Sequence, residues 1–342
     1  ALSSAASDVY KRQEATNEAY RLYCEAAQFI IEDNPEFMER ALNIPKEIGE
    51  RIRASWDADE LSLYGRFDFI LAKDGTPKIL EFNADTPTSL LEASVIQWQW
   101  KEDVFPECDQ FNGIHEGLVQ SWKDIFPKKG EIHFAGALEN NEDTGTLQYL
   151  ASTAMEAGFS TRVLDMQALD LQNGRFFDPA GELVNRCFKL YPWEWMVDES
   201  PDGCLAEMEW LEPIWKLVMS NKAILATLYE LFPDSPYVLP CYLSRPRSGL
   251  FCKKPVFSRE GHNVSVVDIR DWEEYVRIAE TEGDYNTGAY VYQEYVEPTA
   301  YSGRYPVIGS WIIGGEAAGI GIRENRMEVT DNLSEFVPHI IG

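Results

Sequence analysis

The 342 residues are too many for one small hydrophobic core, so the length predicts two or three packed subdomains. A formal net charge of −27 argues against a nucleic-acid partner, because such proteins neutralise phosphates with lysine and arginine. No stretch is long and uncharged enough to cross a membrane, and the six cysteines show no paired or metal-ligand spacing. We therefore expect a globular protein of the cytoplasm with reduced, mostly buried cysteines and no membrane partner.

The beginning of the chain, ALSSAASDVYKRQ, is small and polar and then basic, without the apolar centre of a signal peptide. We expect residues 1–13 to be a cloning or assembly scar, or disordered, and exclude them from the fold. From Glu14 to about Ala54 the apolar spacing predicts helices, most clearly in NEAYRLYCEAAQFIIED.

A hairpin is predicted in YGRFDFILAKDGTPKILEFNADTPTSL, residues 64–90. Asp74 and Gly75 between alternating apolar runs are typical of a two-residue loop with positive φ at both positions. Such a loop brings two pairs of polar residues opposite each other on one face, namely Asp68 with Glu81 and Arg66 with Asn83. The other face would pack on the core through Phe67, Phe69, Leu80 and Phe82.

Two facing carboxylates destabilise a hairpin unless a positive charge lies between them. Asp68, Glu81 and Asn83 offer the hard oxygen ligands that suit Mg²⁺ or Mn²⁺, and Arg66 could hold a phosphate or carboxylate oxygen. In this interpretation the metal-free protein stores like-charge repulsion, so Asp68→Asn should leave it equally or slightly more stable. The alternative is an ordinary solvent-exposed hairpin.

After the hairpin, SLLEASVIQWQWKEDVF and IHEGLVQSWKDIF predict helices. A β-α-β unit follows, with strands at 131–137 and 160–165, a helix from about Asp143 to Ala157, and Gly158 as its stop. In CFKLYPWEWMV we favour a buried aromatic cluster over a ligand platform.

The rest of the chain predicts a helix in NKAILATLYELF, a strand-loop-strand in LFCKKPVFSREGHNVSVV, a strand in AYVYQEYVEP and a hairpin in GSWIIGGEAAGIGIREN. Lys254 precedes a loop that could cradle phosphate, with a plain turn as the alternative. Gln293 and Glu294 could pair with an adenine edge or simply be solvated on an edge strand. Lys222 alone fits a surface lysine.

Several phrases in this order resemble the synthetase half of glutathionylspermidine synthase, and more closely its bacterial homologues without the amidase half, which are acid–amine ligases. The phrases are RFDF, LEFNADTPTSLLEA, FKLYPWEW, SNKAIL, KPVFSREG, IGSW, AGIGIRE and SEFVPH, and they run from about residue 14 to the C-terminus. Family members usually carry additional sequence before the point where this chain begins, so the N-terminus looks truncated.

The resemblance implies an α+β (α/β) fold of ATP-grasp architecture, with an antiparallel core sheet and a small Rossmann-like pre-ATP-grasp β-α-β domain. Residues 14–130 would form a helical region and the metal-binding hairpin, 131–220 the pre-ATP-grasp-like domain, 221–300 the nucleotide lid subdomain and 301–342 a return to the core. The hairpins at 64–84 and 307–323 should then share one antiparallel sheet.

The resemblance also implies the site residues. Asp68, Glu81 and Asn83 would bind Mg²⁺, or Mn²⁺, at the ATP phosphates. The catalytic arginines would be Arg66 at the reacting carboxylate, Arg259 in a mobile loop over the phosphates, residues 257–264, and Arg323 near the γ-phosphate. The nucleotide would be bound by Lys222, Lys254, Gly261, Gln293, Glu294, Tyr295 and Val296.

The implied reaction is ATP-driven amide formation through an acyl phosphate, joining a peptide or glutathione-like acid to an amine such as a polyamine. The synthase has Gln where this chain has Val307, and its glycine-rich loop differs from SREGHN, so the acid and the amine stay open. One alternative is a non-catalytic ATP-binding protein that retains the fold. Another is a thiol amidase, but none of the four histidines has a recognisable setting beside a cysteine.

Overall fold

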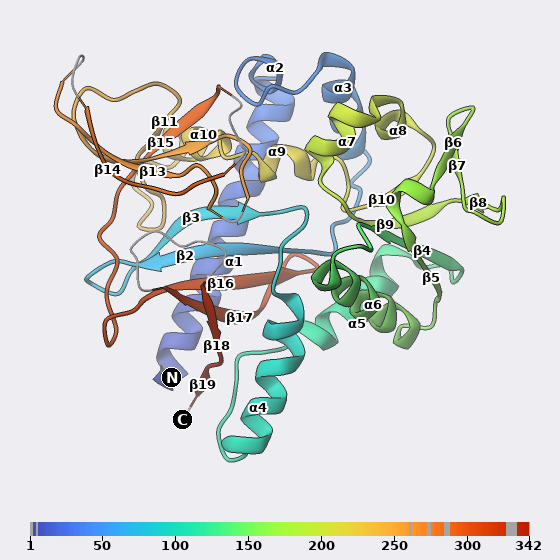
Figure 1. Cartoon of the computed structure of the whole chain (residues 1–342), viewed down its shortest axis with the longest axis horizontal. Helices are drawn as coiled ribbons and strands as arrows, with labels where there is room; N and C mark the ends of the chain where they lie inside the picture. Colours follow the sequence, from blue (N-terminus) through green and yellow to red (C-terminus); the bar gives the residue numbers. More distant parts are fainter. Residues whose placement is uncertain are drawn as a thin grey trace.

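The computed structural model describes residues 3–4, 6–259, 261–271, 275–283, 288–325 and 334–341 (Figure 1). Its central sheet is antiparallel and has the strand order β18-β17-β16-β2-β3. The strands are β2 (Tyr64–Leu71), β3 (Pro77–Asn83), β16 (Tyr305–Ile313), β17 (Glu316–Asn325) and β18 (Glu335–Val337). Because β2 pairs with β16, from Tyr64 opposite Ile313 to Phe69 opposite Ile308, the two hairpins share one sheet as predicted.

The first hairpin reaches the predicted pairing by a different route. Its turn is longer than predicted: the Ala72 and Thr76 backbones pair, and of Asp74 and Gly75 only Gly75 has positive φ, at 82°. This loop alone would shift the register by one residue, but a bulge between Asp68 and Phe69 restores it, so Asp68 still faces Glu81. Because of this bulge, the prediction that Leu80 packs in the core was wrong: Ile79 is buried there, whereas Leu80 lines a cleft.

Helix α1 (Ala6–Gln28) crosses behind the central sheet (Figure 1). Tyr23 packs edge-to-face on Phe67 and Phe82, with ring centroids 5.2 and 5.4 Å apart. The helix begins at Ala6, so the start predicted at Glu14 was too late. A π-helical turn (Phe29–Asp33), α2 (Glu36–Arg40) and α3 (Lys46–Asp57) complete the predicted helical region.

A parallel sheet of order β10-β9-β4-β5 confirms the β-α-β unit. Its strands are β4 (Glu131–Gly136), β5 (Ser160–Asp165), β9 (Arg186–Leu190) and β10 (Glu209–Leu211). Helix α6 (Asn141–Glu156) connects β4 to β5, and Gly158 follows it with a φ of 95°. The aromatic cluster is only partly buried, because Phe188 and Trp193 are enclosed whereas Trp195 is 39% exposed.

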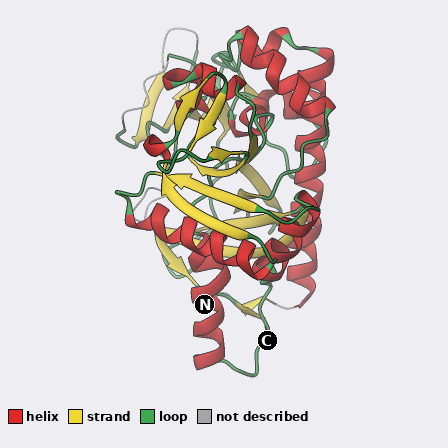
Figure 2. Ribbon diagram, turned by 90° about the vertical axis from the view of Figure 1, so that its right-hand side faces the viewer, coloured by secondary structure: helices red, strands yellow, loops and turns green. Residues whose placement is uncertain are grey.

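A third sheet, the outer sheet, is antiparallel with the order β11-β15-β12-β13-β14. Its strands are β11 (Cys241–Tyr242), β12 (Gly249–Pro255), β13 (Ser265–Ile269), β14 (Tyr275–Glu280) and β15 (Tyr290–Glu294). The connection between β12 and β13 is the predicted strand-loop-strand. Figure 2 shows long helices down one side of the sheets and further helices across their lower part.

The remaining elements connect and cover these sheets. The helical ones are a π-helical turn (Glu92–Ile96), α4 (Gln97–Val104), α5 (Ile114–Ile125), a 3-10 turn (Met166–Ala168), α7 (Trp193–Glu199), α8 (Pro201–Leu205), α9 (Lys216–Ser220) and α10 (Ile224–Leu231). The short strands are β1 (Ser3–Ser4), β6 (Asp170–Gln172), β7 (Arg175–Phe177), β8 (Leu183–Val184) and β19 (Ile340–Ile341). All six cysteines are free thiols, and within the described ranges no helix is long and apolar enough to cross a bilayer.

Candidate functional site

A cleft lies between the central sheet and the outer sheet and encloses about 1300 Å³, including its part open to solvent. Its lining brings together every residue that the sequence predicted for the site: Arg66, Asp68, Glu81, Asn83, Lys222, Lys254, Arg259, Gly261, Gln293, Glu294, Tyr295, Val296 and Arg323. Val307 lines the same cleft. Residues from both hairpins of the central sheet and from the outer sheet therefore line the same cleft.

Asp68 is held by two arginines. Arg66 donates to both of its oxygens, from Nε at 2.7 Å and Nη2 at 3.0 Å, and Arg323 donates from Nη2 at 2.7 Å. Burial raises the pKa of the Asp68 carboxyl, but the two guanidinium groups outweigh burial and hold that pKa below its usual value. Asp68 is consequently a buried, ionised carboxylate.

Glu81 has its own cation. Its Oε2 lies 3.1 Å from Nζ of Lys222, which also donates to the Ser258 carbonyl at 2.6 Å. Burial raises the pKa of Glu81, yet Lys222 and Lys254 bring it below its usual value. Lys222 is thus a buried residue of the cleft and not a surface lysine.

These contacts correct the expectation of stored repulsion between Asp68 and Glu81. Each carboxylate is paired with cations of the protein itself, which hold both pKa values below their usual range although Asp68 still raises that of Glu81. The donor set still fits Mg²⁺, because the carboxylates and the amide of Asn83 offer hard oxygen ligands that line one cleft. Asn83 Nδ2 already lies 3.3 Å from Asp68 Oδ2, so the potential ligands are neighbours.

Lys254 is positioned by a buried amide. Its Nζ donates to Oε1 of Gln293 at 2.7 Å and to the Leu80 carbonyl at 3.2 Å. Gln293 is 1% exposed and donates in turn to the Ile79 carbonyl at 2.9 Å. The side chain of Gln293 therefore joins β15 to β3, which excludes the solvated-edge alternative for this residue.

Arg259 reaches across the cleft from the loop after β12. Its Nε and Nη2 lie 3.1 and 2.7 Å from Oε1 of Glu194, and its Nη1 donates to Oγ1 of Thr86. Thr281 donates to the Gly261 carbonyl in the same loop. The predicted mobile loop, 257–264, includes Glu260, which lies outside the described residues.

Comparison with known families identifies the family of this chain. The model of the family described as "Glutathionylspermidine synthase preATP-grasp" matches residues 2–342. The chain belongs to this family. The "Putative acid--amine ligase" of Haemophilus influenzae is 35% identical, over 97% of this chain and 87% of its own length. The trypanothione synthetase of Crithidia fasciculata is 28% identical, over 92% of this chain and 52% of its length.

The chain thus spans most of the ligase but about half of the trypanothione synthetase. Among solved structures, a glutathione synthetase-like effector from Globodera pallida matches with a TM-score of 0.60 and 10% identity, over 99% of this chain and 89% of that one. This likeness shows the fold alone. The family relationship places the chain among C–N bond-forming ligases, and its ATP-grasp-type fold is as predicted.

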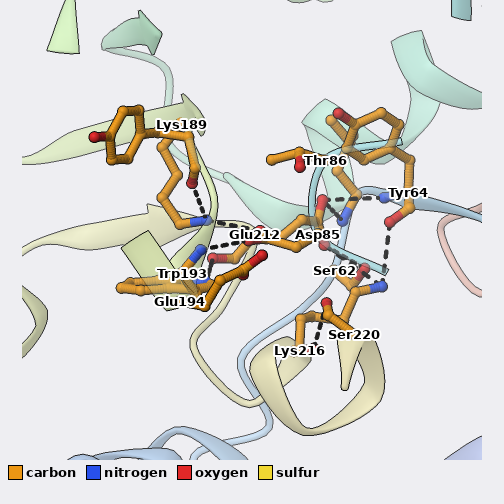
Figure 3. Close-up of polar contacts among 12 residues, drawn as sticks. Ser62, Tyr64, Asp85, Thr86, Lys189, Trp193, Glu194, Glu212, Lys216 and Ser220 are labelled. Carbon is orange, nitrogen blue, oxygen red and sulfur yellow. Dashed lines mark hydrogen bonds and ion pairs between the residues drawn. The ribbon is translucent and has the colours of Figure 1, made fainter. Parts of the chain in front are cut away.

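Sequence reasoning missed a buried polar cluster beside the cleft (Figure 3), of which Asp85 and Lys189 lie in two phrases that had only indicated the family. Lys189 and Asp85 form a fully buried ion pair of 2.7 Å, and Asp85 also accepts from the Trp193 backbone at 2.8 Å. Glu212, likewise buried, accepts from Ser62 Oγ and from the backbone of Leu63 and Tyr64. The sequence signals that could have revealed it were Lys189 within an apolar strand and Glu212 directly after another.

Glu212 should make stability depend on pH. Burial raises the pKa of Glu212 from 4.5 to about 7. The Asp85 charge also raises this pKa, whereas Lys216, 3.7 Å away, lowers it. Between these values the folded protein keeps a proton that the unfolded chain has released, so stability falls as pH rises, by up to about 1.4 kcal/mol per unit. Urea unfolding should show a smaller fall for Glu212→Gln than for the wild type. Glu209→Gln, an exposed control at the start of β10, the strand directly before Glu212, should keep the full slope, and an equal slope in Glu212→Gln would contradict this assignment.

Proposed function

We propose that this chain is an ATP- and Mg²⁺-dependent ligase that joins a small-molecule carboxylate to an amine through an acyl phosphate. The observation that supports it is one cleft that gathers three oxygen ligands and several cations. The ligands are Asp68, Glu81 and Asn83, and the cations are Arg66, Lys222, Lys254, Arg259 and Arg323. Phosphoryl transfer depends mainly on such positioning and charge neutralisation.

In this proposal Asp68, Glu81 and Asn83 hold the metal, which neutralises phosphate charge when bound. Lys222 and Lys254 hold the phosphates, and the segment Gln293–Val296 holds the adenine through its backbone. The backbone N–H groups of Glu294 and Tyr295 donate to Pro240 and Leu250, so the protein itself uses both. Contact with adenine is therefore expected further along, from Val296.

The reaction has two steps. The substrate carboxylate attacks the γ-phosphorus and ADP leaves, with Arg66 and Arg323 beside the transferred group; the amine then displaces phosphate from the acyl carbon. Arg259 lies over the same region, held by Thr86 and Glu194. Its loop, residues 257–264, would exclude water, which otherwise hydrolyses the acyl phosphate.

The family description suggests a glutathione-like acid and a polyamine-like amine. Val307, in place of the glutamine of the synthase, contributes an apolar side chain to the cleft and supports a somewhat different substrate. We also propose that residues 131–220 form the pre-ATP-grasp domain and 221–300 the nucleotide lid.

The test is ADP release with ATP, Mg²⁺ and a panel of acids and amines that includes glutathione and spermidine, with the amide detected by mass spectrometry. We expect ADP and amide in equal amounts for at least one pair. Binding of ADP with Mg²⁺ but no turnover across the panel would favour a non-catalytic nucleotide-binding protein.

A further inference from the structure

A second cavity adjoins the cleft on the side away from the adenine segment. It is small, with about 20 Å³ of room for a water-sized group, and shares Glu81, Asn83, Thr86, Lys222 and Arg259 with the cleft. None of the residues 293–296 lines it, whereas Glu194 lines only this cavity. The shared residues include two of the three proposed metal ligands, Glu81 and Asn83, so the second cavity meets the proposed reaction centre away from the adenine segment.

Glu194 has an unusual environment there. Arg259 contacts only Oε1, whereas Oε2 is buried without a hydrogen-bond partner in the described part of the chain. The side chain is 12% exposed, so little solvent compensates this oxygen. A buried carboxylate oxygen without a donor is costly, and a ligand that donates a hydrogen bond would remove that cost.

The other carboxylates that line this cavity already have partners. Both oxygens of Asp85 are bound, by Lys189 and by the Trp193 backbone, and Glu81 is paired with Lys222. Arg259 fixes the orientation of Glu194 through Oε1 and leaves Oε2 for a substrate. A base held by a third group is the arrangement that proton transfer requires.

We propose that Glu194 is the general base for the amine substrate, whose reacting nitrogen it meets in this second cavity. The proposal rests on the ligase function above. An amine arrives at neutral pH as an ammonium group, which cannot attack until it loses a proton. Glu194 Oε2 accepts a hydrogen bond from the ammonium group and takes one proton. The free amine nitrogen then forms its bond to the acyl carbon, the carbon–oxygen bond to phosphate breaks, and a second nitrogen proton leaves with the phosphate.

The experiment compares two nucleophiles. Hydroxylamine is uncharged at neutral pH and needs no base, so with ATP, Mg²⁺ and glutathione it reports formation of the acyl phosphate as a hydroxamate. Spermidine is fully protonated and reports the complete reaction as an amide. Glu194→Gln keeps an acceptor oxygen for Arg259 but loses their ion pair, so hydroxamate formation should fall much less than amide formation, which should be about 10² to 10⁴ times slower. Its amide rate should rise with pH, about tenfold per unit, as free amine accumulates.

Two controls separate this role from a structural one. Glu199→Gln, on the exposed face of the same helix, should behave as the wild type in both reactions. The rise in melting temperature on adding ADP and Mg²⁺ should be the same in all three proteins. Equal loss of both products in Glu194→Gln, or no loss of amide, would overturn the proposal. If the wild type forms neither product with glutathione or any other acid of the panel, the ligase function itself fails.

Discussion

Replacing Asp68 with Asn should strongly reduce ATP turnover and also destabilise the ligand-free protein. Asn cannot neutralise Arg66, which is 5% exposed, or Arg323, which lies 2.7 Å away. Removing one partner of a buried ion pair costs about 3 to 5 kcal/mol, because the other charge stays buried. Turnover should fall about 100-fold or more, since a group that orders the charges around the transferred phosphoryl is lost.

Urea unfolding without ligand and melting temperatures with and without ADP and Mg²⁺ measure the two effects of Asp68→Asn separately. Asp74→Asn, in the exposed turn of the same hairpin, is the matched control and should change neither. Glu81→Gln should lose turnover in the same way. A full thermal shift in Asp68→Asn would show that this residue does not hold the metal, and unchanged ligand-free stability would show that its arginine contacts contribute nothing.

Lys189→Met should be the most destabilising single change outside the cleft. It leaves the Asp85 carboxylate, which is 1% exposed, with one backbone donor and no cation, at a cost of about 3 to 5 kcal/mol. Asp85 fixes the start of the segment that carries Thr86 and Thr88, and the Thr88 carbonyl accepts from Arg66. Activity should therefore fall together with stability.

The double variant Asp85→Asn, Lys189→Met tests whether the unpaired charge is the cause. It should lose less stability in urea than Lys189→Met alone, because no buried charge remains without a partner. Lys123→Met on the exposed side of α5 should change stability by less than about 0.5 kcal/mol. If the double variant were the less stable of the two, lost packing would be the better explanation.

The first hairpin, β2–β3, shows how much of the structure residue alternation and turn preferences can predict. Alternation and the Asp-Gly turn predicted that Asp68 faces Glu81, and this is confirmed. The predicted two-residue turn was wrong. The predicted pairing is nevertheless present because a bulge compensates for the longer loop, and the bulge places Ile79 in the core instead of Leu80. Strand propensity does not specify a bulge, since the bulge depends on what packs on each face.

The family phrases predicted which residues would meet in the cleft, but not how they are held. The contacts of Lys189 with Asp85 and of Glu194 with Arg259 join segments that are distant in the chain. No periodicity reports such a pairing, because it depends on how the sheets are placed relative to one another. For the same reason Gln293, predicted for the adenine pocket, could not be recognised as the support of Lys254.

The two strands that pair with β2 leave the ribosome at very different times during synthesis. During synthesis β3 emerges from the ribosome directly after β2, but β16, which covers the other edge of β2, follows about 240 residues later. At about 5 to 20 residues per second, the nascent chain carries that open edge for roughly 10 to 50 s. An uncovered strand edge invites pairing with other chains, so the growing polypeptide should depend on a chaperone until its last hairpin has left the ribosome.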